Sequence, residues 1–527
     1  MEFGHTPAGL EHRHRYRSED EEIWLGQTPL NHAVYTEEKG LDACGRTAWQ
    51  KQGAERLAGS HESVASWRPL GEHRYEWDKS GRLTGHEVRS KTRTERETRY
   101  RYDSRDQITD VLRQSADGPA QEERYRYTVN EQIAESRING ILSQHQYSNE
   151  CVSQAGDSRY EYDACGRVTK RTEQKRGFRP QEWRYRWDDF DRLREVRTPD
   201  GEVWQYRYDA FGRRTTKRNV IRAAWKQQSH AISEVRYQWL GMALSVSEKR
   251  YADGSPALRE QWHYRGGFEL LAKEAKAAND ERSYFYPIVT GPDGAPEEMY
   301  SANGLKVWTR QRSLWGLAAA NDSPFSGSDH ESCDAGFMGQ WQDEESGLWY
   351  NLHRYMDSGT GQYLSQDPLK LGGGLETQSY VHDPVGWSDP LGLSGFFTPS
   401  VFTGPSGITY TVYQQNIDWD LPVNTRNGVK TNLQLILEEQ RSPMVVKNGE
   451  YSIVTLHHSN QQGHGSLFES STKMHEQYRY TNALHPYLPE AHPTDPVDRA
   501  LFDKDRIEYW KQRALAELER RMAEDKC

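Results

Sequence analysis

Histidine is concentrated in one stretch near the C-terminus of the chain. Six of the nineteen histidines lie between residues 457 and 492, and the first two are adjacent. They are His457, His458, His464, His475, His485 and His492. Neutral imidazole binds divalent metals and titrates near neutral pH, so such a cluster indicates metal-assisted hydrolysis. The alternative is that these histidines only pack in a core or face solvent.

Aspartate-proline steps form a second chemical group upstream. The pattern Asp-Pro-x-Gly begins at Asp383 and again at Asp389, and a further Asp-Pro step begins at Asp367. Two carboxyl groups held close together share a proton, so one can activate water while the other protonates a leaving amide. The same pattern is also typical of a tight turn, which is the alternative interpretation.

The composition indicates what kind of chain must position these residues. Only 35% of the 527 residues are hydrophobic, but 30 are tyrosine and 17 are tryptophan, which argues against disorder and favours wide β-sheets. The length predicts two or three domains. A net charge of −10 argues against nucleic-acid affinity over the whole surface, and five cysteines without a CxxC pair argue against a zinc ribbon.

The chain contains no run of 18 apolar residues and no hydrophobic segment at its N-terminus. We therefore expect a protein that folds in the reducing cytoplasm of its producer, without stable membrane insertion. If it leaves the cell, we expect it to do so without a cleaved signal peptide.

An aromatic-x-aromatic-Asp unit recurs through the first part of the chain. Clear or looser copies begin at Tyr75, Tyr100, Tyr125, Tyr160, Tyr185, Tyr206 and Tyr237. Consecutive aspartates lie about 21 to 25 residues apart, which indicates stacked supersecondary units. The two rings face one side of a strand, and Asp-x-x-Gly closes a turn in which glycine takes a positive φ. The sequence thus predicts stacked antiparallel hairpins in a long, curling sheet.

These units resemble the YD repeats of the Rhs (rearrangement hotspot) family over roughly residues 35 to 393. In that family the repeats wind into a hollow, cocoon-like β-shell around a C-terminal cargo. The resemblance implies a mainly β YD-repeat shell at residues 1–336 and a core-terminal autoprotease segment at 337–393. It also implies aspartyl self-cleavage between Leu393 and Ser394. By motif match, Asp389 and Asp383 are the catalytic candidates, with Asp367 as the third.

The predicted secondary structure becomes mixed α/β after Leu393. Strands are predicted at 410–413 and 451–456, and helices at 431–440, at 468–480 and from the cap Asp498 to about residue 523. The adjacent His457 and His458 lie at the end of the second predicted strand.

The sequence around these histidines resembles the LHH family of HNH/endonuclease VII toxins over about residues 410 to 515. The matching positions are Leu456-His457-His458, Gln461, Glu469, His475 and Leu484-His485-Pro486. The resemblance implies a small α+β His-Me finger (ββα-metal) nuclease domain. We expect its linker and start at residues 394–450 and its core at 451–527.

The resemblance and the needs of a metal site together suggest roles. We expect His457, His475 and His485 to bind a divalent ion, which is Mg²⁺, Mn²⁺, Ni²⁺ or Zn²⁺, and His458 to act as the general base. Adjacent strand residues point to opposite sides, which supports splitting the pair, although a bend at the strand end would reverse the roles. Glu469 is expected to orient a histidine or to coordinate through water, and Gln461 to position substrate or backbone.

The predicted function is that of an Rhs-family antibacterial toxin whose shell autocleaves after Leu393 to release a metal-dependent DNA endonuclease. The expected partners are DNA, a cognate immunity protein and components of a type VI secretion spike or adaptor, with delivery into the cytoplasm of a target cell. Unclosed sheet edges predict a homodimer through the repeat region, with a monomer as the alternative. The rival function is a non-enzymatic β-repeat scaffold or surface protein with a structural metal site.

Overall fold

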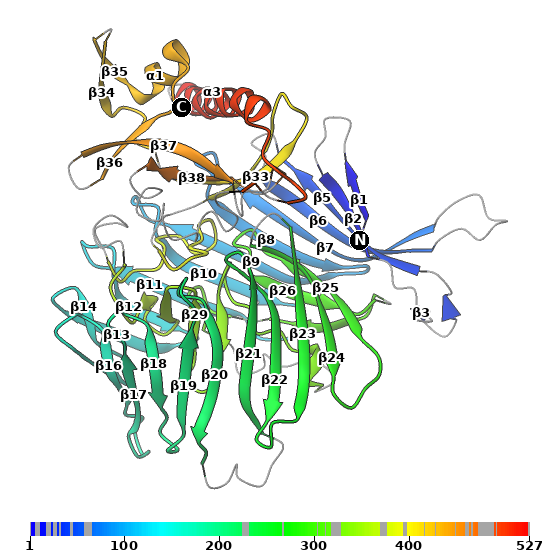
Figure 1. Cartoon of the computed structure of the whole chain (residues 1–527), viewed down its shortest axis with the longest axis vertical. Coiled ribbons are helices and arrows are strands. Elements are labelled where there is room, and N and C mark those ends of the chain that lie inside the picture. Colours follow the sequence, from blue (N-terminus) through cyan, green and yellow to red (C-terminus); the bar gives the residue numbers. More distant parts are fainter. Residues whose placement is uncertain are drawn as a thin grey trace.

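A computed structural model of the chain gives the architecture shown in Figure 1. The structure describes residues 2–5, 11–16, 23–24, 29–30, 33–42, 46–56, 66–223, 231–265, 268–302, 304–310, 312–317, 328–368, 377–393, 398–415, 417–426, 428–447, 450–458, 463–464, 467–472, 490–491 and 493–524. Within these residues, no helix combines the length and the apolar character that crossing a membrane requires.

One antiparallel sheet of 25 strands makes up most of the chain. Its first strands are β1 (Glu2–His5), β2 (Glu11–Tyr16), β5 (Ala33–Leu41), β6 (Thr47–Arg56), β7 (Ser66–Trp77), β8 (Leu83–Ser90), β9 (Thr94–Tyr102), β10 (Ile108–Ser115), β11 (Gln121–Tyr127), β12 (Ile133–Ile138), β13 (Ile141–Ser148) and β14 (Cys151–Ala155). A separate short hairpin joins β3 (Ile23–Trp24) to β4 (Pro29–Leu30).

The sheet continues in the same way to residue 309. Its further strands are β15 (Ser158–Tyr162), β16 (Val168–Glu173), β17 (Gln181–Trp187), β18 (Leu193–Arg197), β19 (Val203–Tyr208), β20 (Arg214–Ile221), β21 (Ile232–Leu240), β22 (Ala243–Tyr251), β23 (Pro256–Arg265), β24 (Glu269–Ala277), β25 (Tyr284–Thr290), β26 (Pro296–Tyr300) and β27 (Lys306–Thr309). From β5 onward each strand pairs with the next one in the sequence, so the predicted stack of antiparallel hairpins is confirmed.

The aspartate of each repeat closes its hairpin as the sequence predicts. Asp163 accepts hydrogen bonds from the backbone amide of Arg167 at 3.0 Å and from its Nε at 2.7 Å. Gly166, between them, has a φ of 74°, which a residue with a side chain rarely adopts. The same pair of bonds recurs at Asp78, Asp188 and Asp209.

The second aromatic residue of each unit joins its hairpin to the preceding one. The Tyr102 hydroxyl donates a hydrogen bond of 2.8 Å to the backbone carbonyl of Leu83. Corresponding bonds of 2.6 to 2.8 Å are made by Tyr127, Trp187 and Tyr208. Tyrosine and tryptophan suit this position because each offers a large apolar ring and a donor that needs a partner when buried.

The sheet curls until β5 to β9 lie opposite β24 to β26 (Figure 1). The rings of Tyr35 and Tyr300 have centroids 5.3 Å apart, and Lys39 Nζ lies 3.0 Å from Glu269 Oε1. Among the described residues these two groups of strands are joined by side chains and not by strand pairing. The expected cocoon-like curvature is therefore present.

Residues 328–368 and 377–393 pack against the large sheet and carry little regular structure. They form the short 3₁₀ helix η2 (Asp329–Glu331) and a small sheet of β28 (Trp341–Asp343), β29 (Leu348–Asn351), β30 (Arg354–Asp357) and β31 (Gln362–Tyr363). Asp343 is fully buried and pairs with Arg214 at 2.5 Å and with Lys217 at 3.0 Å, both on β20. Trp341 lies edge-on to Trp262 of β23 at 4.8 Å. These contacts fix the segment in the curl of the sheet.

The C-terminal part is a small α+β domain above the large sheet (Figure 1). Five strands lie in the order β32 (Thr398–Thr403), β33 (Thr409–Gln414), β38 (Leu467–Ser471), β37 (Glu450–His458) and β36 (Met444–Lys447). A hairpin joins β34 (Pro422–Thr425) to β35 (Gly428–Thr431), and the helices are α1 (Asn432–Glu439) and α3 (Arg499–Glu524). A mainly β repeat shell with a small α+β domain is thus confirmed as the fold class.

Most predicted elements of this domain are confirmed, and one is wrong. The strands at β33 and β37 and the helices α1 and α3 occur where expected, with Thr431 capping α1 in a capping box. The start of the helix predicted at 468–480 is instead β38, which pairs with β37 so that His458 faces Leu467 and Val454 faces Ser471. All five residues of β38 are buried, so pairing outweighs the helical preference of this short segment.

Candidate functional site

The adjacent histidines end β37 and face opposite sides of its sheet. The ring of His458 packs on Phe502 of α3 with centroids 4.1 Å apart. His457 stands directly across from Phe468 in β38, and the Phe468 ring lies 6.4 Å from Phe268, which precedes β24 of the large sheet. Because paired residues share a face, His458 points toward α3 and His457 toward the large sheet. The two histidines therefore have different surroundings, and the division of roles between them stays a prediction.

His458 is held as a neutral imidazole in a largely apolar setting. It is 6% exposed, and its Nε2 has no hydrogen-bond partner among the described residues. Burial, aided by the nearby Arg499, lowers its pKa to about 4, although Asp495 and Asp505 act in the opposite direction. At neutral pH the ring therefore offers a free lone pair, which suits proton abstraction or coordination of a metal.

Glu469 binds the long C-terminal helix. Its Oε1 accepts a hydrogen bond of 2.5 Å from the Tyr509 hydroxyl and one of 2.9 Å from Arg513 Nε, and its Oε2 accepts one of 2.8 Å from the Gln415 amide. The carboxylate is almost fully buried. None of the partners that the structure gives this carboxylate is a histidine, so its described role is to join β33 and β38 to α3.

The remaining positions of the nuclease pattern are only partly described. Gln461, His475 and His485 lie outside the described residues, as does His492. His464 is exposed, and its Nδ1 lies 2.7 Å from Asp495 Oδ1. The described residues therefore place His457, His458 and Glu469 at one end of the β37–β38 hairpin, with the first two on opposite faces.

Upstream, two of the three candidate aspartates meet at one arginine. Arg354 Nη2 lies 3.1 Å from Asp389 Oδ2 and 3.2 Å from Asp367 Oδ2, and all three side chains are buried. The Tyr363 hydroxyl donates to Asp389 Oδ2 at 2.8 Å, and the Leu393 amide donates to its Oδ1 at 2.9 Å. Burial raises the pKa of Asp389, and the negative Asp367 adds to this rise while Arg354 opposes it. Two interacting carboxyls thus lie beside the expected cleavage point.

Asp383 lies in its own turn. Its Oδ1 accepts a hydrogen bond of 3.1 Å from the Val385 amide, and its backbone carbonyl accepts one of 2.9 Å from the Trp387 amide. Burial raises its pKa to about 7. The structure thus groups Asp389 with Asp367, and gives Asp383 the turn role that Asp-Pro-x-Gly sequences favour.

Sequence reasoning gave no role to several residues that build these sites. Arg354 also donates to the Gly392 carbonyl at 2.5 Å, and Asn351 donates to the Asp389 carbonyl at 2.7 Å. Both lie in the stretch Gly-Leu-Trp-Tyr-Asn-Leu-His-Arg-Tyr at residues 347–355, inside the predicted autoprotease segment, and this position is the signal that could have marked them. No motif marks Gln415, the partner of Glu469. It directly follows β33, and the pairing of β33 with β38 brings it to Glu469.

Comparison with known protein families gives two matches. Residues 68–226 match the family described as Teneurin YD-shell. Residues 431–516 match the family described as a nuclease of the HNH/ENDO VII superfamily with conserved LHH.

Several curated proteins are also similar. Probable deoxyribonuclease RhsA of Dickeya dadantii (strain 3937) is 33% identical over 257 residues, which are 48% of this chain and 16% of that protein. Probable deoxyribonuclease RhsB of the same strain is 33% identical over 245 residues, 46% of this chain and 16% of that protein. Toxin protein Tse5 of Pseudomonas aeruginosa is 32% identical over 145 residues, 26% of this chain and 10% of its own length. The chain thus spans less than a fifth of the length of these relatives.

Among solved structures, TcdB2-TccC3 without its hypervariable C-terminal region is similar with a TM-score of 0.41 and 16% identity. The similarity covers 74% of this chain and 23% of that one.

Proposed function

The chain is a member of the Rhs/YD-repeat family that carries a C-terminal LHH-type nuclease domain, and from this premise we propose that it is a toxin that cuts the DNA of a target cell. The observation that carries the proposal is the placement of the Leu456-His457-His458 motif at the end of β37, inside the region that matches the nuclease family. The names of the relatives RhsA and RhsB, probable deoxyribonucleases, support DNA as the substrate.

In this proposal His458 is the general base and His457, together with His475 and His485, holds a divalent ion. The buried Nε2 of His458, which has no partner among the described residues, fits a site completed by a bound ion or water. The ion would polarise a phosphate oxygen and stabilise the leaving 3′-oxygen. Glu469 acts through Tyr509 and Arg513, holding α3 against the hairpin that presents the histidines.

The release step is assigned to Asp389 and Asp367. Water adds to the carbonyl carbon of Leu393, the bond to the nitrogen of Ser394 breaks, one carboxylate takes the proton of the water, and the other carboxyl donates a proton to the leaving amine. Support comes from the Leu393 amide, which is bound to Asp389, and from Arg354, which holds both aspartates. Asp383 was the first partner suggested by motif match, and its place in a separate turn favours Asp367.

Export and protection belong to the same proposal. We infer that the chain is synthesised in the cytoplasm, carried by type VI secretion components into a target cell, and neutralised in its producer by a cognate immunity protein. Similarity to Toxin protein Tse5 supports a toxin role. The homodimer expected from open sheet edges stays a prediction, and light scattering over micromolar concentrations tests it.

Expression in a sensitive bacterium tests the proposed target. The wild-type chain should degrade the nucleoid and block growth, and co-expression of the immunity protein should restore both. A growth defect with intact chromosomal DNA would contradict DNA as the target. The non-enzymatic rival requires that the cells grow normally.

A further inference from the structure

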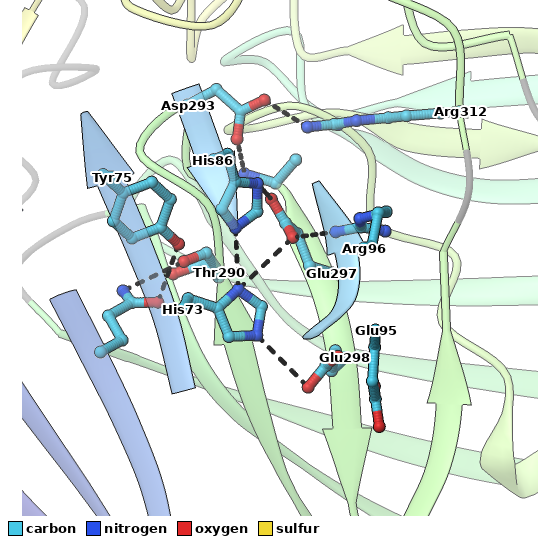
Figure 2. Close-up of polar contacts among 12 residues, drawn as sticks. His73, Tyr75, His86, Glu95, Arg96, Thr290, Asp293, Glu297, Glu298 and Arg312 are labelled. Carbon is cyan, nitrogen blue, oxygen red and sulfur yellow. Dashed lines mark hydrogen bonds and ion pairs between the residues drawn. The ribbon is translucent and has the colours of Figure 1, made fainter. Parts of the chain in front are cut away.

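A second group of metal-binding residues lies inside the curled sheet, away from both sites described above. His73 of β7 and His86 of β8 are 0% and 5% exposed, and Glu297 of β26 faces them across the curl (Figure 2). Each side chain offers one ligand atom, and the three atoms lie within 4.8 Å of one another. The neighbouring strands β7 and β8 thus meet a strand that follows them by more than two hundred residues.

The spacing of the donor atoms suits a small divalent ion. His73 Nδ1 lies 3.1 Å from His86 Nε2 and 3.7 Å from Glu297 Oε2. Ligands at about 2.0 to 2.1 Å from a tetrahedral zinc ion stand roughly 3.4 Å from one another. The distance to the carboxylate is too long for a hydrogen bond and fits two atoms that share an ion.

The surrounding groups orient the ligands. His73 Nε2 lies 3.4 Å from Glu298 Oε2, so a carboxylate faces the ring nitrogen opposite the proposed ligand atom, as in many histidine–metal sites (Figure 2). Arg96 Nη2 donates a hydrogen bond of 2.8 Å to Glu297 Oε2. This bond orients the carboxylate, and the guanidinium also competes with a metal ion for its negative charge.

A cavity adjoins the group and supplies room for a further ligand. His86 and Glu297 line it, together with Arg96, Asp293 and Arg312, and its volume is about 60 Å³. A single water needs roughly 10 to 15 Å³ measured in this way. A water can therefore complete a tetrahedral set made by two histidines and one carboxylate.

We propose that His73, His86 and Glu297 bind a zinc-like divalent ion that clasps the N-terminal strands of the shell to β26. The two regions are otherwise joined by side-chain contacts among the described residues, such as Lys306 to Glu95 at 3.0 Å. An ion bound only by the folded chain stabilises it by mass action, so the clasp would hold the curl closed. The alternative is a metal-free cluster in which the rings of His73 and His86 share one hydrogen bond.

Zinc content of the full-length chain tests the proposal. Protein stripped with a chelator and dialysed against limiting zinc should hold one more zinc ion per chain in the wild type than in His73→Ala or His86→Ala. His145→Ala is the matched control, because His145 is a buried shell histidine whose two ring nitrogens have no partner among the described residues. Any ion in the C-terminal domain is common to all of these chains and cancels in the comparison.

Glu297→Gln covers the case in which a histidine variant fails to fold. It keeps the size of the side chain and should weaken zinc binding by more than about tenfold, because a neutral amide is a poor ligand. Zinc should raise the thermal midpoint of the wild type and of His145→Ala more than that of Glu297→Gln. Equal zinc content and equal midpoint shifts in wild type and Glu297→Gln would overturn the clasp.

Discussion

Asp367 and Asp389 share one guanidinium nitrogen, since Arg354 Nη2 lies 3.2 Å from the first carboxylate and 3.1 Å from the second. Asp389 also accepts a hydrogen bond from the backbone amide of Leu393, the last residue before the expected cleavage point. Two buried carboxyls beside one peptide bond have the arrangement that acid–base hydrolysis of an amide requires.

Asparagine at either position should therefore stop self-cleavage. Wild-type protein is expected to run on a denaturing gel as fragments of residues 1–393 and 394–527, whereas Asp389→Asn and Asp367→Asn should each run as one intact band. An amide keeps the size of the side chain but cannot exchange the proton.

Asp383→Asn is the matched control for this experiment, because its carboxyl lies in a separate turn. It should be cleaved like the wild type. Loss of cleavage in Asp383→Asn with normal cleavage in Asp367→Asn would restore the pairing suggested by motif match.

Asp383 should instead affect the pH dependence of stability. Burial raises its pKa from 3.8 to about 7, so the folded chain binds this proton more tightly than the unfolded chain. The bound proton raises the free energy of unfolding by about 4 kcal/mol. This contribution is complete below about pH 4 and is lost as the pH rises to about 7.

Asp383→Asn is neutral at every pH and should raise the thermal midpoint relative to wild type at pH 8 but not at pH 4. Asp189→Asn, at an exposed position of a repeat turn, should change the midpoint equally little at both values. A midpoint difference for Asp383→Asn that does not depend on pH would contradict the assignment.

The ion pair between Glu469 and Arg513 should stabilise the C-terminal domain. Arg513→Ala leaves the buried carboxylate without its charged partner, and the opening free energy of amides in β38 and α3 should fall by about 3 kcal/mol in hydrogen exchange. Arg506→Ala removes an exposed pair with Asp503 on the same helix and should cost less than about 1 kcal/mol. Equal effects of the two variants would contradict the structural role of Glu469.

The sequence predicts local structure well where a few adjacent residues determine it. The turn at Asp163 and Gly166 follows from side-chain hydrogen bonding and positive φ, so the repeat hairpins are readable from their motif. The histidine pair falls at a strand end for a similarly local reason.

Long-range packing sets the features that the sequence does not predict. Asp367 meets Asp389 only because β30 places Arg354 between them, and no spacing rule connects these three positions. The segment from Leu467 becomes a strand because it pairs with β37, although its residues are compatible with a helix. His73 and Glu297 meet through the curl of the entire sheet, which no repeat motif encodes.

Plasmid cleavage by purified full-length protein is the most direct test of the central claim that this chain is a metal-dependent nuclease using His458. With Mg²⁺, Mn²⁺, Ni²⁺ or Zn²⁺ the wild type and the control His464→Ala should convert supercoiled plasmid to nicked and linear forms, and EDTA should stop the reaction. His458→Ala should lower the rate by about 10²- to 10⁴-fold, as expected for a lost general base. Plasmid that stays intact with every metal, or a His458→Ala variant that cuts at the wild-type rate, would contradict the claim.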